Sequence, residues 1–259
     1  MEVGVFSKQN HNLLIFLNHK ITDLIIGRQL NAESVGYYSV GYEISNLPTT
    51  ELVFPLSRAI FPGYALIEGD LNALKNTFLK FTKLVVYVAA PVSFGIAAVS
   101  EELVITALGD KWVEVIPIIS ILSFYGLMRC SVQNIGSIYL AIGKPKISFF
   151  ISLFRMIIFV PILLYFIKIQ GVNGAAISVL IVSFLTVPIS YLIVSYYINL
   201  KLIEIISIFV FPILSSTLMY YVVSEWSYIL SFYGVDLHEF IDFSRSWALL
   251  IFKASIGIF

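Results

Sequence analysis

Two arginines within apolar sequence are the residues of this chain best suited to binding chemistry. Arg129 and Arg155 have no acidic residue at helical spacing within their own apolar segments. Arginine keeps its charge and presents a planar fork of N–H donors that fits a phosphate or a carboxylate. The sequence leaves two interpretations open for each: an ion pair across helices with Glu43, Glu51 or Asp23, or a position in an aqueous cavity that attracts an anion.

Polar residues also recur along the apolar segment at 36–61. At 100° per residue one stripe forms, and its members are Ser39, Glu43, Asn46, Thr50 and Ser57. Prolines recur every seven residues and loosen the helix, at Pro48, Pro55 and Pro62. Glu51 and Arg58 lie on the flank of the stripe. We weigh two interpretations equally: a hydrogen-bonded seam between helices with a Glu51–Arg58 pair, or the lining of a polar path.

The segment at 12–28 carries a lysine and an aspartate close together. Lys20 and Asp23 lie three residues apart and can pair on the helix surface, which is the favoured interpretation. A carboxylate near the middle of a span is also what coupling to a proton or a sodium ion requires, because its charge can change as access alternates.

Other common chemistries have no support in the sequence. There is no H-E-x-x-H or G-x-S-x-G motif and no glycine loop that would cradle a phosphate. Cys130 is the single cysteine, so no disulfide within the chain and no cysteine metal cluster is expected. Sixteen basic and sixteen acidic residues leave no basic face for a nucleic acid. We therefore expect no enzyme active site, no metal site and no nucleic-acid partner.

Long apolar helices must hold these residues in position. The 259 residues are 59% hydrophobic and 12% charged, with a mean hydropathy of +0.92, whereas soluble domains are about 25% charged. A membrane span needs about 20 apolar residues, and a helix satisfies its own backbone in lipid. The sequence predicts an all-α, polytopic transmembrane bundle. Seven full spans are expected at 12–28, 36–61, 79–100, 115–141, 147–168, 174–199 and 203–224.

The remaining residues predict an outer loop and a last helix that is cut short. The loop is polar and covers 225–245, and an apolar run at 247–259 is too short to cross a bilayer. Lysines are retained on the cytoplasmic side of a membrane. One set of alternate connections between the predicted spans is rich in lysine and contains Lys8, Lys75, Lys80, Lys83, Lys144, Lys146 and Lys201. The N-terminus of the chain is therefore expected in the cytoplasm.

Three blocks of sequence then point to a family. The first contains Asp23–Arg28, Gly36–Ser39, Asn46–Pro48 and Phe61–Pro62; the second Leu108–Trp112, Pro117, Ile121–Leu122 and Ala141–Lys146; the third Gly171–Ala176. In this order they resemble the second half of Wzx-type oligosaccharide flippases, which belong to the multidrug/oligosaccharidyl-lipid/polysaccharide superfamily. The similarity is greatest to its teichuronic acid and colanic acid exporter branch.

The resemblance implies a flippase of the cell (inner) membrane. Such a protein carries undecaprenyl-diphosphate-linked oligosaccharide repeat units to the outer leaflet, for O-antigen, capsule or exopolysaccharide biosynthesis, by alternating access of two lobes. The chain is expected to supply the C-terminal lobe in residues 1–200, with further spans in 201–259. Its expected partners are the missing N-terminal lobe of the same protein, membrane lipids, and a polysaccharide polymerase with its assembly proteins.

The resemblance also suggests roles for the charged residues. Arg129 and Arg155 are the expected anion contacts in a central cavity, with Arg58 as a weaker one. Glu43 and Asp23 are the expected ion-coupling residues, and no cofactor is expected besides a coupling proton or sodium ion.

Other functions remain open from the sequence. A drug or cation exporter of the same superfamily would have an aromatic cavity lined by acids. A membrane enzyme, such as a polysaccharide polymerase or an acyltransferase, would carry paired arginines or a histidine–acid motif in a large outer loop. A third alternative is an assembly subunit that does not transport.

Overall fold

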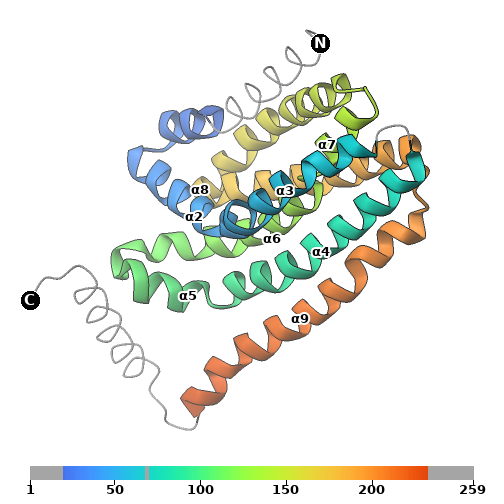
Figure 1. Cartoon of the computed structure of the whole chain (residues 1–259). Coiled ribbons are helices and arrows are strands. Elements are labelled where there is room, and N and C mark those ends of the chain that lie inside the picture. Colours follow the sequence, from blue (N-terminus) through green and yellow to red (C-terminus); the bar gives the residue numbers. More distant parts are fainter. Residues whose placement is uncertain (1–19, 68–69, 233–259) are drawn as a thin grey trace, which may run out of the picture.

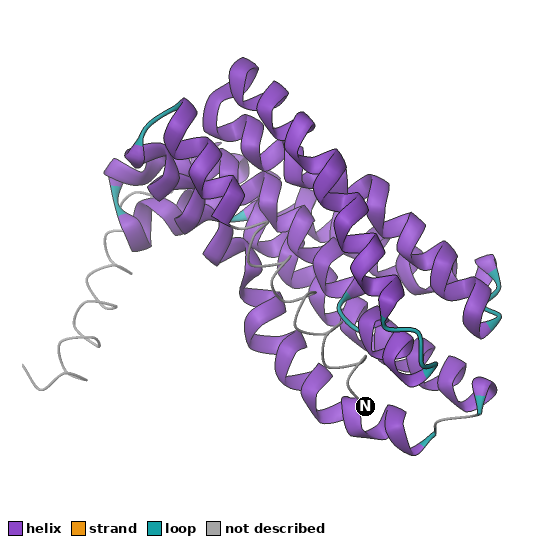
Figure 2. Cartoon of the chain, turned by 90° about the horizontal axis from the view of Figure 1, so that it is seen from above, coloured by secondary structure: helices purple, strands orange, loops and turns teal. Residues whose placement is uncertain are grey.

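The computed structural model describes residues 20–67 and 70–232, which are almost entirely helical (Figure 1). Long helices lie side by side and are joined by short connections, as the view from above also shows (Figure 2). No strand occurs within these described ranges. The all-α prediction is therefore confirmed.

The elements follow one another closely along the chain. In order they are α2 (Ala32–Leu47), η1 (Pro48–Val53), α3 (Phe54–Leu66), α4 (Leu71–Ala98), α5 (Ser100–Leu103), η2 (Val104–Leu108), η3 (Asp110–Val115), α6 (Ile116–Val132), α7 (Ile135–Ala141), α8 (Lys146–Ile198) and α9 (Leu202–Phe232). The segments η1 and η2 are π-helical, and η3 is a 3-10 helix. Residues 20–29, before α2, are also helical.

Four of the described helical segments are long and apolar enough to cross a membrane. They are Leu71–Ala98, Asp110–Ala141, Lys146–Ile198 and Leu202–Glu225. They coincide with the predicted spans from 79–100 onward, so the chain is a helical membrane protein. The candidate span Leu202–Glu225 agrees with the predicted span 203–224. Helix α9 continues beyond it to Phe232, into the segment expected to form the polar loop. The expected helix at 247–259 lies outside the described residues.

Helix α8 is two antiparallel helices joined at a single glycine. Gly171 has φ 58° and ψ −135°, which is not a helical conformation. The Ser178 hydroxyl donates to the Ile162 carbonyl at 3.3 Å, although sixteen residues of straight helix would separate these residues by about 24 Å. Residues 146–170 and 172–198 thus form a hairpin, as the two predicted spans require. Gly174 permits the close approach, because a Cβ there would overlap the Phe166 carbonyl.

The helix over residues 32–66 contains a wide turn in its middle. Asn31 caps its start by accepting a hydrogen bond from the Ser34 amide at 2.8 Å. The π-helical segment η1 begins at Pro48, which has no amide hydrogen to donate to the preceding turn. The prediction that proline loosens this helix is confirmed at Pro48, whereas Pro55 and Pro62 lie within the α-helix α3. Because a π-helical turn holds more residues than an α-helical one, residues on either side of η1 no longer follow one period of 100°.

Helix α6 lies at the centre and contacts α2, α4 and α8. Gly126 of α6 faces the backbone of α2, where an added Cβ would lie 2.5 Å from the Ser45 carbonyl oxygen. The Ser45 hydroxyl donates to the Gly41 carbonyl of its own helix at 2.7 Å and lies 3.2 Å from the Ile119 carbonyl of α6. Small residues therefore bring α2 and α6 close together, as is common between membrane helices.

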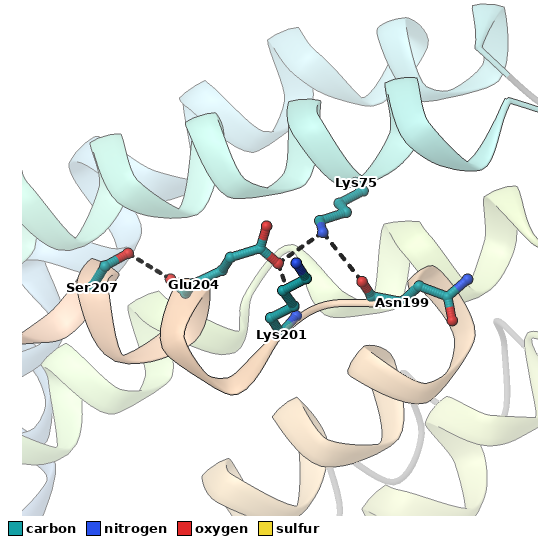
Figure 3. Close-up of polar contacts among 5 residues, drawn as sticks. All are labelled: Lys75, Asn199, Lys201, Glu204 and Ser207. Carbon is teal, nitrogen blue, oxygen red and sulfur yellow. Dashed lines mark hydrogen bonds and ion pairs between the residues drawn. The ribbon is translucent and has the colours of Figure 1, made fainter.

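Helix α9 lies along α4 and is tied to it at one end of the bundle (Figure 3). The Lys75 ammonium lies 2.8 Å from Glu204 Oε2 and donates to the Asn199 carbonyl at 3.2 Å. At the same end, the Lys144 ammonium lies 4.4 Å from the centre of the Tyr197 ring. Loops that the sequence assigned to one side of the membrane therefore do share one end of the bundle.

The opposite end of the bundle carries acidic segments. Tyr37 and Trp112 make an edge-to-face contact at 5.9 Å, which joins the start of α2 to η3. The Ser100 and Ser120 hydroxyls, 2.8 Å apart, join the start of α5 to α6. Nearby acidic residues at this end are Glu33, Glu101, Glu102, Asp110 and Glu114.

Candidate functional site

A cavity of about 500 Å³ lies between α2, α3, α6, α7 and both arms of the α8 hairpin. Its polar lining includes Arg129, Gln133, Ser148, Ser152, Arg155 and Ser190. Arg129 and Gln133 lie on consecutive turns of the central helix, and Ser148, Ser152 and Arg155 on consecutive turns of the first arm of α8. Helical spacing thus places both polar rows on one cavity.

Arg129 is held by two groups of α2. Its guanidinium donates to the Tyr42 hydroxyl and, at 3.1 Å, to Asn46 Oδ1. The same guanidinium lies 5.8 Å from the centre of the Tyr42 ring, a distance at which a ring face attracts a cation. Both partners are neutral, so Arg129 keeps its positive charge at the cavity.

Arg155 is held in a similar way by α6. It donates to the Tyr125 hydroxyl at 3.4 Å and lies 5.7 Å from the centre of that ring. The Tyr125 and Tyr42 rings are 6.1 Å apart, and Tyr38 stacks on Tyr42 at 6.1 Å. A cluster of three tyrosines therefore lies between the two guanidinium groups.

The lining given by the described residues contains no carboxylate. Across residues 20–67 and 70–232, neither Arg129 nor Arg155 forms an ion pair. The alternative of ion pairs across helices is therefore wrong for these two arginines. The two guanidinium groups are surrounded by hydroxyl and amide groups, and each has N–H donors beyond those already used.

The other predicted site residues lie elsewhere. Asp23 pairs with Lys20 at 3.7 Å, as predicted, and it does not line the cavity. Glu43, Glu51 and Arg58 are exposed on α2, η1 and α3, and the suggested Glu51–Arg58 pair does not form. The predicted polar stripe is thus divided, since Asn46 is buried and holds Arg129 whereas Glu43 faces outward.

The tyrosines were missed by reasoning from the sequence. Tyr38, Tyr42 and Asn46 follow one another at intervals of four residues on α2. Tyr125 likewise precedes Arg129 by four residues on α6. Residues four apart share a helix face, so this pattern was available. The pattern does not stand out, because the tyrosine ring is largely apolar and does not interrupt an apolar segment.

The cysteine and the acids build no metal site in the part of the chain that the structure describes. No group of three histidine, cysteine, aspartate or glutamate side chains comes together there. Cys130 is buried, with its Sγ 3.2 Å from the Thr49 hydroxyl oxygen.

Comparison with known proteins relates this chain to polysaccharide biosynthesis. Residues 6–117 match the family described as "Polysaccharide biosynthesis protein". The lipopolysaccharide biosynthesis protein WzxC of Escherichia coli (strain K12) is 30% identical over 215 residues, which are 83% of this chain and 41% of that protein. An uncharacterized membrane protein in the cps region of Klebsiella pneumoniae is 29% identical over 180 residues, 70% of this chain and 37% of the relative.

A third relative is the teichuronic acid biosynthesis protein TuaB of Bacillus subtilis (strain 168). It is 29% identical over 134 residues, which cover 52% of this chain and 28% of that protein. The chain thus spans less than half the length of the relatives that it matches. No solved structure matches the chain at a significant level.

Proposed function

The chain is a relative of the polysaccharide biosynthesis proteins, and on this premise we propose that it takes part in flipping undecaprenyl-diphosphate-linked oligosaccharide repeat units across the inner membrane. The protein acts as a transporter and not as an enzyme, and it works by alternating access. Residues 1–200 provide the C-terminal lobe and 201–259 further spans, while the N-terminal lobe of the same protein is the partner. A polysaccharide polymerase and assembly proteins use the flipped repeat units.

The observation that carries the proposal is the cavity with two arginines and no carboxylate in its described lining. A volume of about 500 Å³ suits a small ligand or the head of a larger one. We assign it to the diphosphate end of the substrate, whose oxygens match guanidinium forks. A cavity for organic cations would instead need acidic residues.

The charges outside this cavity fit a second, outward surface of the lobe. Glu43, Glu51 and Arg58 are exposed on one helix, and a charge facing lipid at the bilayer centre costs about 2.5–3.5 kcal/mol. The proposed N-terminal lobe, or water between the lobes, covers them. Glu43 and Asp23 are the proposed coupling residues for a proton or sodium ion, and Arg58 is an additional anion contact at this surface.

The orientation is proposed from the two ends of the bundle. The end that carries Lys75, Lys144 and Lys201 faces the cytoplasm, because lysine-rich loops are retained there. The acidic end then faces outward.

The test uses the full-length protein and the sidedness of lipid-linked oligosaccharide in membrane vesicles. Deletion of the gene should leave the oligosaccharide on the cytoplasmic leaflet, and the native gene should restore its transfer. The Arg129→Ala and Arg155→Ala variants should each lower the transfer rate about tenfold, the effect of losing one charged contact of about 1.4 kcal/mol. Lys111→Ala, an exposed residue of η3, is the matched control and should transfer normally.

The outcomes separate the possibilities. Unchanged sidedness in the deletion strain would reject the flippase, and a loss of drug export in that strain would favour a drug or cation exporter. Normal transfer by a protein with both alanines would remove the two arginines from the mechanism and leave the flippase standing.

A further inference from the structure

Two lysines on the outer face of α4 have no acidic partner in the described structure. Lys80 and Lys83 are exposed, and neither belongs to the ion pairs found among the described residues. They lie three residues apart, so they are neighbours on the helix surface and repel each other. Lys75, on the same helix, is already neutralised by Glu204.

We place these lysines at the boundary between headgroups and hydrocarbon. The 28 residues of α4 span about 42 Å, whereas the hydrocarbon core is about 30 Å thick. The charged residues of α4 all lie in its first half, from Lys75 to Lys83, so we assign the excess length to the basic end, where the first turns, up to about residue 78, extend beyond the apolar layer. Lysines just inside this boundary direct their ammonium groups back toward the phosphates of the headgroups.

The side chains beside the lysines form an aromatic ledge. The Lys83 ammonium lies 5.6 Å from the centre of the Tyr87 ring. Tyr87 in turn stacks on Phe211 of α9, with ring centres 5.9 Å apart and planes 18° from parallel. Tyrosine is favoured at the membrane interface because its ring is apolar and its hydroxyl is wet.

Beyond the ledge, the outer faces of α4 and α9 are apolar. Their exposed residues continue away from the lysines, on α4 as Leu84, Val88 and Val92 and on α9 as Leu214 and Leu218. The surface thus presents two lysines without acidic partners, then two aromatic rings, then exposed apolar residues. A phospholipid presents its phosphate, glycerol backbone and acyl chains in the same order.

We propose that this surface, defined by Lys80, Lys83, Tyr87 and Phe211, is a binding site for an anionic phospholipid. The lipid phosphate bridges the two ammonium groups and removes their repulsion, and an acyl chain lies along the exposed apolar residues of α4 and α9. The site is separate from the arginine cavity, and it does not depend on what the protein transports.

The test compares phosphatidylglycerol with phosphatidylcholine on the purified chain in neutral detergent, with bound lipids counted by native mass spectrometry. The native chain should retain phosphatidylglycerol preferentially. Each lysine near an anionic surface contributes about 1 kcal/mol, so Lys80→Gln with Lys83→Gln should weaken phosphatidylglycerol binding by roughly tenfold or more. Lys80→Arg with Lys83→Arg should keep it, and 0.5 M salt should weaken it in the native chain.

The matched control removes two exposed lysines from the other end of the bundle. Lys111→Gln with Lys168→Gln should leave phosphatidylglycerol retention unchanged, and circular dichroism should show the same helicity in all variants. Equal retention of phosphatidylglycerol by the Lys80/Lys83 glutamine variant and the native chain would overturn the proposal. A change of oligomeric state in that variant would also overturn it, because the surface would then bind another copy of the chain.

Discussion

Each guanidinium of the cavity is positioned by a tyrosine and not by an acid. Tyr42 and Tyr125 accept hydrogen bonds from Arg129 and Arg155 through their hydroxyls and attract them through their rings. A carboxylate in the same place would neutralise the charge and compete with an entering anion. A tyrosine fixes the position of the guanidinium and leaves its charge available.

At this scale we predict the effect of removing one hydroxyl. Tyr125→Phe keeps the ring contact with Arg155 and removes the acceptor, so the free energy of unfolding in detergent should fall by about 1–2 kcal/mol. Tyr165→Phe removes a hydroxyl from an exposed tyrosine and should change stability by less than about 0.5 kcal/mol. Equal stability of the Tyr125→Phe variant and the native chain would show that the hydrogen bond contributes nothing.

The two arginines could be found in the sequence because charge without a local partner is rare in an apolar segment. Their neighbours could not be fixed in the same way. Whether Arg129 meets Glu51 or Tyr42 depends on the rotation of α2 against α6, which the contact of Gly126 with Ser45 sets. That rotation is a property of packing and not of helical period.

At the scale of elements, apolar length predicted the spans from 79–100 to 203–224 and missed local irregularity. The boundaries of 147–168 and 174–199 match the arms of α8 because Gly171 and Gly174 mark the reversal in the sequence. The π-helical segment η1 was not predicted, although Pro48 suggested a weak point. A missing hydrogen bond shows where a helix can widen and does not show whether packing will widen it.

The reversal of α8 leads to a second prediction. Gly171→Ala should lower the free energy of unfolding by about 1–2 kcal/mol, since φ of 58° strains a residue that has a Cβ. Nothing lies within 4 Å of that Cβ, so the cost is conformational and not steric. Gly95→Ala is the control: it lies inside α4, where its Cβ would make an ordinary 3.7 Å contact with Met219, and stability should stay the same or rise. The same loss in both variants would contradict the explanation.

At the scale of the whole molecule, charge is arranged in three zones. One end carries Lys75, Lys144 and Lys201, the other carries a group of acidic residues, and the outer face of α2–η1–α3 carries Glu43, Glu51 and Arg58. The first two zones suit the two surfaces of a membrane. The third lies along the length of a helix, where lipid would be a poor neighbour.

The third zone gives a prediction that separates the chain alone from the assembled transporter. Glu51→Leu should raise the free energy of unfolding of the isolated chain in lipid by up to about 3 kcal/mol, because it removes an exposed charge from an apolar layer. The same change in the full-length protein should lower transport of lipid-linked oligosaccharide. Glu114→Leu, at the acidic end, should do neither. A Glu51→Leu chain that is less stable than the native chain would mean that lipid does not face this residue.

The α8 hairpin restricts how the cavity can change size. Its arms are clamped where Ser178 meets Ile162 and Gly174 meets Phe166, and each arm supplies part of the wall. We therefore expect the two arms of the hairpin to move together as one rigid unit and not to slide along each other. The wall that faces the hairpin includes Tyr38 and Tyr42 of α2 and Phe54 of α3, and the π-helical segment η1 lies between these two helices. We therefore expect a change in the size of the cavity to bend the chain at Pro48.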